Sequence, residues 1–143
     1  MSDPVLLAEL RRDEGVVRHA YQDSLGFWTI GVGRLIDRRR GGGLSDAEID
    51  LLLSNDIQRV DAGLDARIPW WRTLDPVRRR VLANMGFNLG VEGLLGFRNT
   101  LPAVREGRYE DAADGMLRSK WARQVGARAV RLAAMMREGS PRA

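Results

Sequence analysis

The 143-residue chain contains no cysteine and only one histidine, His19. The lack of cysteine excludes disulfide bonds and thiolate metal sites, and a single histidine does not supply the usual ligand set of a zinc site. No motif in the sequence is typical of an organic prosthetic group. We therefore expect the protein to need no metal and no cofactor.

Long apolar runs are also missing. No stretch is long enough for a transmembrane helix, and the first fifteen residues, MSDPVLLAELRRDEG, lack the basic-then-apolar layout of a signal peptide. We therefore expect a soluble protein made in the cytoplasm, without stable membrane insertion. The length suits one domain, and 44% hydrophobic with 29% charged residues is ordinary for a globular protein.

Acidic residues are too few to balance the basic ones. The chain has 23 basic residues, of which only Lys120 is lysine, against 19 acidic residues, and its pI is about 10.5. From Gly115 onward there are seven basic residues and one acidic residue. This bias is compatible with a solvated helix face or with attraction of the basic C-terminal region to an anionic polymer, such as nucleic acid or the cell envelope.

The first part of the chain predicts a short helix followed by a β-hairpin. Asp3 can cap a helix that starts at Pro4, and Gly15 is well placed to end it. Residues 18–22 and 27–30 have the character of two strands joined by a tight turn.

The rest of the chain predicts helices. Ser45 and Glu48 form a capping box for a helix over about residues 45–64. Further helical segments are predicted from Asp75 onward, around 91–96 and 100–106, and over about 109–118 and 127–138. Strands are expected only near residues 18–36, so the fold class is α+β and mostly α.

Glu14 is placed to act as an acid. It lies four residues beyond Leu10, on the apolar stripe formed by Leu6, Leu7 and Leu10, and at the C-terminal end of the helix. Partial desolvation and the helix dipole both favour the protonated carboxyl and so raise the pKa of Glu14. A general acid that works near neutral pH needs this property.

Asp23 and Thr29 complete a possible catalytic set. Asp23 opens the turn, where a hydrated carboxylate stays ionised, and Thr29 on the returning strand can hold a water through its hydroxyl. Two carboxyls whose surroundings push their pKa values apart are typical of glycoside hydrolysis. Each residue alone has a structural explanation, as an ion-pair partner, a turn residue or a strand former. Their spacing, with eight and then five residues between them, makes the set specific.

This spacing resembles the E-x8-D-x5-T signature of the phage-type lysozymes. The resemblance runs from about Leu7 to Arg137 and continues, in order, through VRRRVLANMGFNLG (77–90), LLGFRNTL (94–101), SKWARQ (119–124) and ARAVR (127–131). It implies an endolysin that hydrolyses the β-1,4 bond between N-acetylmuramic acid and N-acetylglucosamine in peptidoglycan. Such an enzyme acts as a monomer on glycan strands and inverts the anomeric configuration.

The same resemblance implies a lysozyme-like, two-lobed fold within one catalytic domain over residues 1–143. A small lobe with the hairpin would cover about 15–50, and a bridging helix about 45–64. The helical lobe would contain residues 1–14 together with about 65–143.

Functional roles also follow from the resemblance. Glu14 matches the general acid, and Asp23 and Thr29 match the residues assigned to the attacking water. Arg128 matches an arginine that pairs with the catalytic glutamate and would lower its pKa, in opposition to burial and the dipole. Asn88 matches an amide nearby.

Three more positions match residues that contact the glycan, namely Leu35, Phe87 and Thr100. Two departures from the family pattern are informative. Arg34 stands where a relative has a histidine that pairs with an aspartate, and the matching aspartate is Asp56, so the resemblance implies an Arg34–Asp56 ion pair. Gly115 replaces an asparagine that contacts substrate.

Alternatives remain open on sequence alone. A lytic transglycosylase needs only one glutamate, so the presence of Asp23 and Thr29 favours hydrolysis. A nucleic-acid-binding protein would explain the high pI, but the four tryptophans are not interleaved with the basic residues as stacking platforms would be. Lacking a signal peptide, an endolysin would wait in the host cytoplasm and reach the periplasmic peptidoglycan through a holin-type pore.

Overall fold

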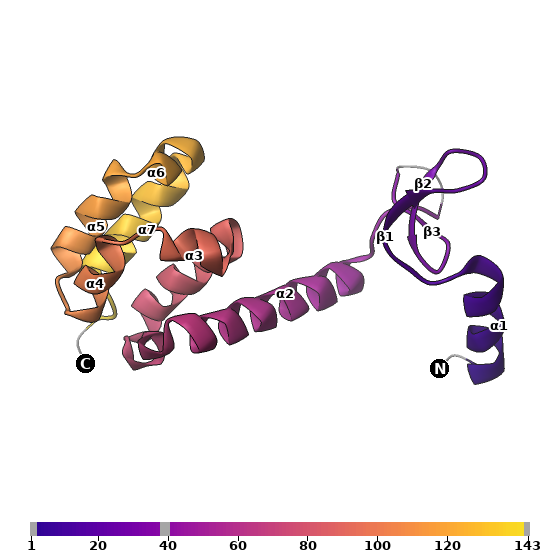
Figure 1. Ribbon diagram of the computed structural model, residues 1–143, viewed down its shortest axis with the longest axis horizontal. Coiled ribbons are helices and arrows are strands. Elements are labelled where there is room, and N and C mark those ends of the chain that lie inside the picture. Colours follow the sequence, from indigo (N-terminus) through magenta and orange to yellow (C-terminus); the bar gives the residue numbers. More distant parts are fainter. Residues whose placement is uncertain (1–2, 38–40, 142–143) are drawn as a thin grey trace. The chain divides into compact units, whose positions relative to one another are not determined.

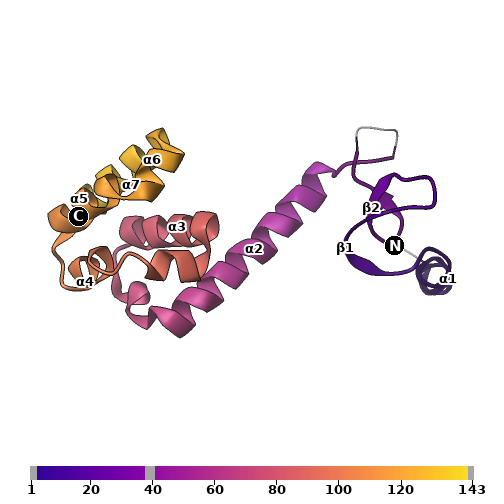
Figure 2. The same ribbon diagram turned by 45° about the horizontal axis from the view of Figure 1, so that its top comes forward.

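The computed structural model describes residues 3–37 and 41–141. The chain forms two compact units, unit 1 (Met1–Leu51) and unit 2 (Leu52–Ala143), and helix α2 (Asp46–Arg67) is continuous across their boundary. Figures 1 and 2 show one unit with the sheet and one that is entirely helical. The predicted class, α+β and mostly α, is confirmed.

Unit 1 contains helix α1 (Pro4–Glu14) and a three-stranded antiparallel sheet in the order β1-β2-β3. The strands are β1 (Val17–Gln22), β2 (Trp28–Gly31) and β3 (Arg34–Leu35). Both predicted ends of α1 are confirmed: the Asp3 carboxylate accepts a hydrogen bond from Val5 N at 2.9 Å, and Gly15 ends the helix with φ 79°. Gly15 meets this requirement because glycine adopts positive φ at little cost.

Helix α2 begins with the predicted capping box. Ser45 N donates to Glu48 Oε1 at 2.8 Å, and Glu48 N donates to Ser45 Oγ at 3.2 Å. The two bonds satisfy backbone donors that have no partner inside the helix. The helix then continues to Arg67, somewhat beyond the predicted end near residue 64.

Unit 2 adds a 3₁₀ turn and five helices to the C-terminal part of α2. These are η1 (Pro69–Thr73), α3 (Pro76–Leu95), α4 (Thr100–Arg105), α5 (Tyr109–Arg118), α6 (Lys120–Val125) and α7 (Ala127–Glu138). The bounds of α5 and α7 are those predicted. Helix α3 absorbs the segment predicted around 91–96, after a kink at Gly90 where φ is 75°.

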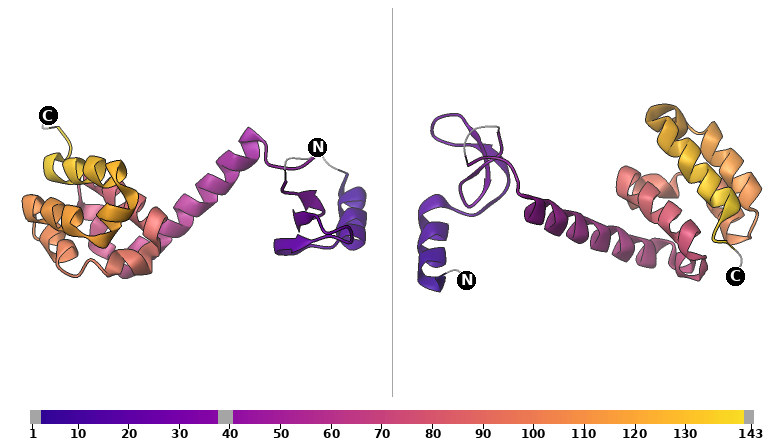
Figure 3. Two further views of the ribbon diagram at one scale, coloured as in Figure 1. Left: turned by 90° about the horizontal axis from the view of Figure 1, so that it is seen from above. Right: turned by 180° about the vertical axis from the view of Figure 1, so that it is seen from behind.

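The core of unit 2 is built from the inner faces of its helices. Leu64 of α2, Met85 of α3, Met116 of α5 and Met136 of α7 are at most 1% exposed. Helices α5 and α7 lie side by side, as Figures 1 and 3 show. Burying each such side chain stabilises the fold by about 1.5–3 kcal/mol.

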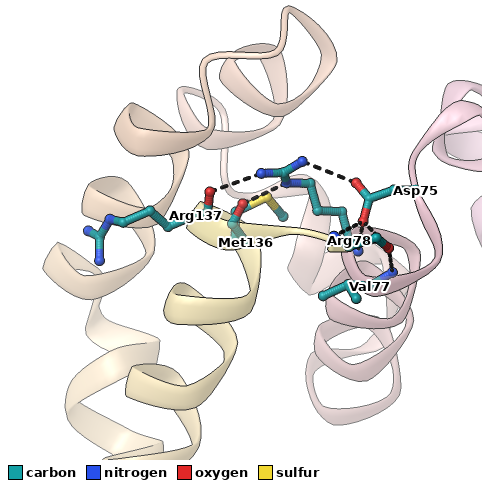
Figure 4. A network of polar contacts seen from close by, with 6 residues as sticks. Asp75, Val77, Arg78, Met136 and Arg137 are labelled. Carbon is teal, nitrogen blue, oxygen red and sulfur yellow. Dashed lines mark hydrogen bonds and ion pairs between the residues drawn. The ribbon is translucent and has the colours of Figure 1, made fainter. Parts of the chain in front are cut away.

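The start of α3 is tied to the residues that follow α7. Asp75 caps α3 by accepting from Arg78 N at 3.2 Å, and it also accepts from Ser140 N at 2.9 Å and Ser140 Oγ at 3.0 Å (Figure 4). Burial by itself raises the pKa of Asp75, but these hydrogen bonds and the nearby charge of Arg78 outweigh it and lower the pKa overall. The contact joins two segments that are distant in sequence.

Candidate active site

Glu14 lies at the last position of α1, against the turn between β2 and β3. A Cβ atom built on Gly33 would be 2.8 Å from Glu14 Oε2, and Gly33 has φ 68°. A side chain at residue 33 would therefore displace the carboxyl as well as strain the backbone. Glycine at this position lets the carboxyl group lie directly on the turn.

Unit 1 does not itself bury this carboxyl. Glu14 is exposed, and Leu7 and Leu10, which lie on the same face of α1, are 47% and 42% exposed. The side chain of Leu6, the third residue of the predicted stripe, lies outside the described structure. The partial desolvation predicted for Glu14 is therefore not a property of unit 1 alone.

Asp23 opens the hairpin turn, as predicted, and one of its carboxylate oxygens organises that turn. Oδ1 accepts from Leu25 N at 2.9 Å and from Phe27 N at 2.8 Å. Its other oxygen, Oδ2, accepts no hydrogen bond from any residue within 3–37 and 41–141. The exposed carboxylate is thus held by one oxygen and keeps the other available for a water or a sugar hydroxyl.

Thr29 is linked to Asp23 through a single peptide group. Thr29 Oγ1 donates to Phe27 O at 2.9 Å, and the same carbonyl accepts from Asp23 N at 2.8 Å. Thr29 is only 2% exposed. Because its hydroxyl proton is donated to a carbonyl, the hydroxyl oxygen is left to accept a hydrogen bond from a water.

The sheet brings Leu35 next to this group. Thr29 of β2 is paired with Tyr21 of β1 on one side and with Leu35 of β3 on the other. Of the predicted glycan contacts, Leu35 is therefore the one that unit 1 places beside the candidate catalytic residues.

Each member of the predicted Arg34–Asp56 pair has a partner within its own unit. Arg34 binds Glu48 at 2.8 Å and also donates to Gly43 O at 3.0 Å, whereas Asp56 is ion-paired with Arg59 one turn further along α2. The capping box at the start of the helix holds Glu48 in place for Arg34. The Arg34–Asp56 ion pair stays a prediction, and if it forms it competes with these local contacts.

The Arg34–Glu48 contact has an electrostatic consequence. The hydrogen bond from Arg34, followed by the bonds that Glu48 makes with Ser45, holds the pKa of Glu48 at about 2. Glu48 is therefore ionised throughout the range in which the protein is expected to act.

In unit 2, Arg128 at the start of α7 is held by an amide on α3. Its Nε and Nη2 donate to Asn84 Oδ1 at 2.9 and 2.7 Å. Asn88, the amide singled out from the sequence, instead accepts from Trp121 Nε1 at 2.8 Å. Asn84 was missed, although it lies in the same NMGFN motif, one helical turn before Asn88.

Arg128, Asn84 and Phe87 line one cavity of about 610 Å³ that lies entirely within unit 2. Phe87 is 44% exposed and offers an apolar ring beside the two polar groups. Four arginines and a single acidic residue, Asp61, line this cavity. It therefore suits an anionic or strongly hydrogen-bonding group next to an apolar surface.

The third predicted glycan contact, Thr100, lies elsewhere in unit 2. It begins α4, is 6% exposed, and lies close to Gly115 of α5. The structure thus separates Phe87 and Thr100 into two different cavities.

Within residues 3–37 and 41–141, no group of three or more histidine, aspartate or glutamate residues is arranged to hold a metal ion. Over the same residues, every helix is too short or too polar to cross a lipid bilayer.

Unit 1 thus contains an exposed glutamate at a helix end and a turn aspartate that is linked to a buried threonine. Glycoside hydrolases that use two carboxyls need groups of this kind. The family model described as Phage lysozyme matches residues 11–138, and the chain belongs to this family. Membership establishes a lysozyme-type glycosidase, for which peptidoglycan is the substrate.

Individual proteins similar to this chain agree with this family. The chain is 26% identical to "Probable T4-type lysozyme 1" of Dictyostelium discoideum, over 92% of each chain. It is 24% identical to "Probable T4-type lysozyme 2" of the same organism, with the same coverage. It is also 28% identical to the "Pre-baseplate central spike protein Gp5" of Enterobacteria phage T4, over 92% of this chain but only 27% of that protein.

Proposed function

We propose that the protein is a muramidase that hydrolyses the β-1,4 bond between N-acetylmuramic acid and N-acetylglucosamine with inversion of configuration. The observation that carries this proposal is that the side chains of Asp23 and Thr29 both bind the backbone of Phe27, Asp23 at its N–H and Thr29 at its carbonyl. It leaves one carboxylate oxygen and one hydroxyl oxygen available as acceptors. Two acceptors held by the backbone of one residue are suited to orienting a water.

In this mechanism Glu14 donates its proton to the glycosidic oxygen as the bond from that oxygen to the anomeric carbon breaks. A water held by Asp23 and Thr29 attacks the anomeric carbon from the opposite face and gives its proton to Asp23. Arg128, which is held by Asn84, supports the acid. Leu35, Phe87 and Thr100 are assigned to glycan contacts.

The biological role is proposed in two forms. The first is an endolysin that degrades peptidoglycan at phage release, reaching it from the host cytoplasm through a holin-type pore. The second is a lysozyme that serves a phage particle, which the 28% identity to part of a central spike protein favours. The glycosidase chemistry is the same in both.

Product analysis tests the proposed chemistry. Purified peptidoglycan is digested, and the released muropeptides are examined by mass spectrometry. Hydrolysis adds one water and leaves a reducing N-acetylmuramic acid end, whereas a lytic transglycosylase leaves a 1,6-anhydro end that is one water lighter. Anhydro products without reducing ends would overturn the hydrolytic proposal.

A further inference from the structure

The edge strand β3 flanks Thr29 but is very short, since it consists only of Arg34 and Leu35. Leu35 is the register partner of Thr29 on β2, and Ile36 N donates to Trp28 O at 3.0 Å just beyond the strand. A strand of two residues makes few ladder bonds of its own. Its position therefore depends on contacts outside the sheet.

Gly43 provides the first of these contacts, because both of its backbone polar groups bind β3. Gly43 N donates to Leu35 O at 3.0 Å, and Gly43 O accepts from Arg34 Nη1 at 3.0 Å. Gly43 has φ 77°, a conformation that glycine adopts at little cost. The segment that leads into α2 is thus fastened to both residues of β3.

Glu48 provides the second contact. The same nitrogen, Arg34 Nη1, lies 2.9 Å from Glu48 Oε1 and 2.8 Å from Glu48 Oε2. Glu48 Oε1 also accepts from Ser45 N at 2.8 Å, so the capping box holds the carboxylate on the first turn of α2. We call Arg34, Gly43 and Glu48 the β3 clamp, and all three residues belong to unit 1.

The β3 clamp lies one residue away from the group that is proposed to hold the attacking water. Arg34 precedes Leu35, and Leu35 supports Thr29 from the neighbouring strand. A displacement of β3 would therefore change the surroundings of the Thr29 hydroxyl. An error of about 1 Å in the position of a reacting group can lower the rate about 100-fold.

We infer that Arg34 is a positioning residue for hydrolysis, which clamps β3 to Gly43 and Glu48 and so keeps the Thr29 hydroxyl in place. This inference rests on the proposed function, which assigns the attacking water to Asp23 and Thr29. Arg34 acts through β3 rather than on the substrate. Because the pKa of Glu48 is held at about 2, the ion pair of the clamp is present at neutral pH.

Steady-state kinetics on soluble peptidoglycan fragments test this role at a temperature where every variant is folded. Arg34→Gln is expected to lower kcat about tenfold and to leave KM within about twofold, because the substrate still binds but the water is less well oriented. Arg34→Lys should recover most of the loss, since one nitrogen makes these contacts and an ammonium can take its place. An unchanged kcat in Arg34→Gln would overturn the inference, even if Tm falls.

A matched control separates the clamp from net charge. Arg18 is exposed on β1 of the same sheet and lies outside the clamp, so Arg18→Gln removes the same charge. Its kcat should stay within about twofold of that of the unmodified protein, in line with the small effect of exposed charges. An equal fall in kcat for Arg18→Gln and Arg34→Gln would reduce the effect to net charge and overturn the inference.

A double variant tests whether Arg34 acts through Thr29. Thr29→Val keeps the shape of the side chain but removes its hydroxyl, and it is expected to lower kcat by itself. If the clamp serves this hydroxyl, adding Arg34→Gln to Thr29→Val should lower kcat by less than about twofold more. A further fall of about tenfold would show that the two residues act independently, and it would overturn the inference.

Amide hydrogen exchange measures the clamp without reference to activity. The Ile36 amide should exchange about three- to fivefold faster in Arg34→Gln than in the unmodified protein, and at an unchanged rate in Arg18→Gln. Unchanged exchange in Arg34→Gln would overturn the clamp and leave the muramidase proposal intact. If the unmodified protein releases no reducing ends, it is the proposed function that fails, and the exchange rate of Ile36 still decides whether Arg34 holds β3.

Discussion

Arg78 Nε, in the first turn of α3, donates a hydrogen bond at 2.7 Å to the carbonyl oxygen of Met136, in the last turn of α7. Arg78 Nη2 reaches the carbonyl of Arg137 at 2.9 Å, and the guanidinium lies 3.4 Å from the ring centroid of Tyr109. The last carbonyls of a helix have no partner within it. One arginine therefore caps a helix on which it does not lie (Figure 4).

Replacing this arginine should destabilise unit 2. Arg78→Gln is expected to lower the free energy of unfolding by about 1–3 kcal/mol, because partly buried carbonyls lose charge-assisted hydrogen bonds. Arg78→Lys should recover only part of the loss, since an ammonium lacks the planar fork. Urea unfolding followed by circular dichroism measures both. Arg80→Gln, which changes an exposed neighbour, is the control. An equal loss of unfolding free energy in that variant would show that Arg78 stabilises unit 2 no more than an exposed arginine does.

The sequence predicted those parts of the fold that depend on residues close together in the chain. Asp3 and Gly15 end α1, and Ser45 with Glu48 starts α2, through contacts between residues at most four positions apart. Such contacts follow from local backbone geometry and leave a recognisable pattern. The small elements η1 and α6 were not predicted.

Contacts between distant residues were predicted less well. The bond from Arg128 to Asn84 joins α7 to α3, and nothing in the NMGFN motif alone indicates which of its two amides faces the arginine. The choice depends on how the two helices pack. Likewise, the resemblance that implies the Arg34–Asp56 pair gives no sign that the capping box also holds Glu48 within reach of Arg34.

The Arg34–Glu48 pair predicts a particular dependence of stability on pH. The folded pKa of Glu48 is lowered to about 2, so the stabilisation from its pairing is present above its unfolded pKa and is lost as pH falls through about 2. Glu48→Gln is therefore expected to lower Tm equally at pH 7 and pH 9, and by less at pH 2 to 3. Differential scanning calorimetry measures these shifts.

Asp56→Asn is the matched variant, because it removes only an exposed pair with Arg59. Its effect on Tm should be smaller than that of Glu48→Gln at pH 7. A larger loss of Tm in Asp56→Asn than in Glu48→Gln would favour the Arg34–Asp56 pair.

The two amides of α3 should have different functions. Asn84→Ala removes the acceptor that holds Arg128, so kcat is expected to fall about tenfold with little change in Tm, because Asn84 is exposed. Asn88 is exposed too, but Asn88→Ala leaves Nε1 of the buried Trp121 without its partner and should cost about 1–3 kcal/mol of stability. Steady-state kinetics and thermal unfolding of both variants test this contrast. A larger loss of kcat in Asn88→Ala than in Asn84→Ala, at temperatures where both are folded, would reverse the assignment.

The role of Asp23 predicts the stereochemistry of the product. If Asp23 orients a water, the two carboxyls should be roughly 6.5–9.5 Å apart in the working enzyme and the initial product should be the α-anomer. NMR spectra recorded during the first minutes of digestion identify the anomer. A β-anomeric initial product would show that Asp23 attacks carbon directly.

The central claim is that Glu14 is the acid of a peptidoglycan hydrolase. Glu14→Gln keeps the shape of the side chain at Gly33 but cannot donate a proton to the leaving oxygen, and a positioned acid is worth roughly 10²–10⁴-fold in rate. The most direct measurement is the rate of reducing-end release from purified peptidoglycan by the two proteins at equal concentration. A fall of at least about 100-fold is predicted, whereas a rate within a few-fold of the unmodified protein would contradict the account.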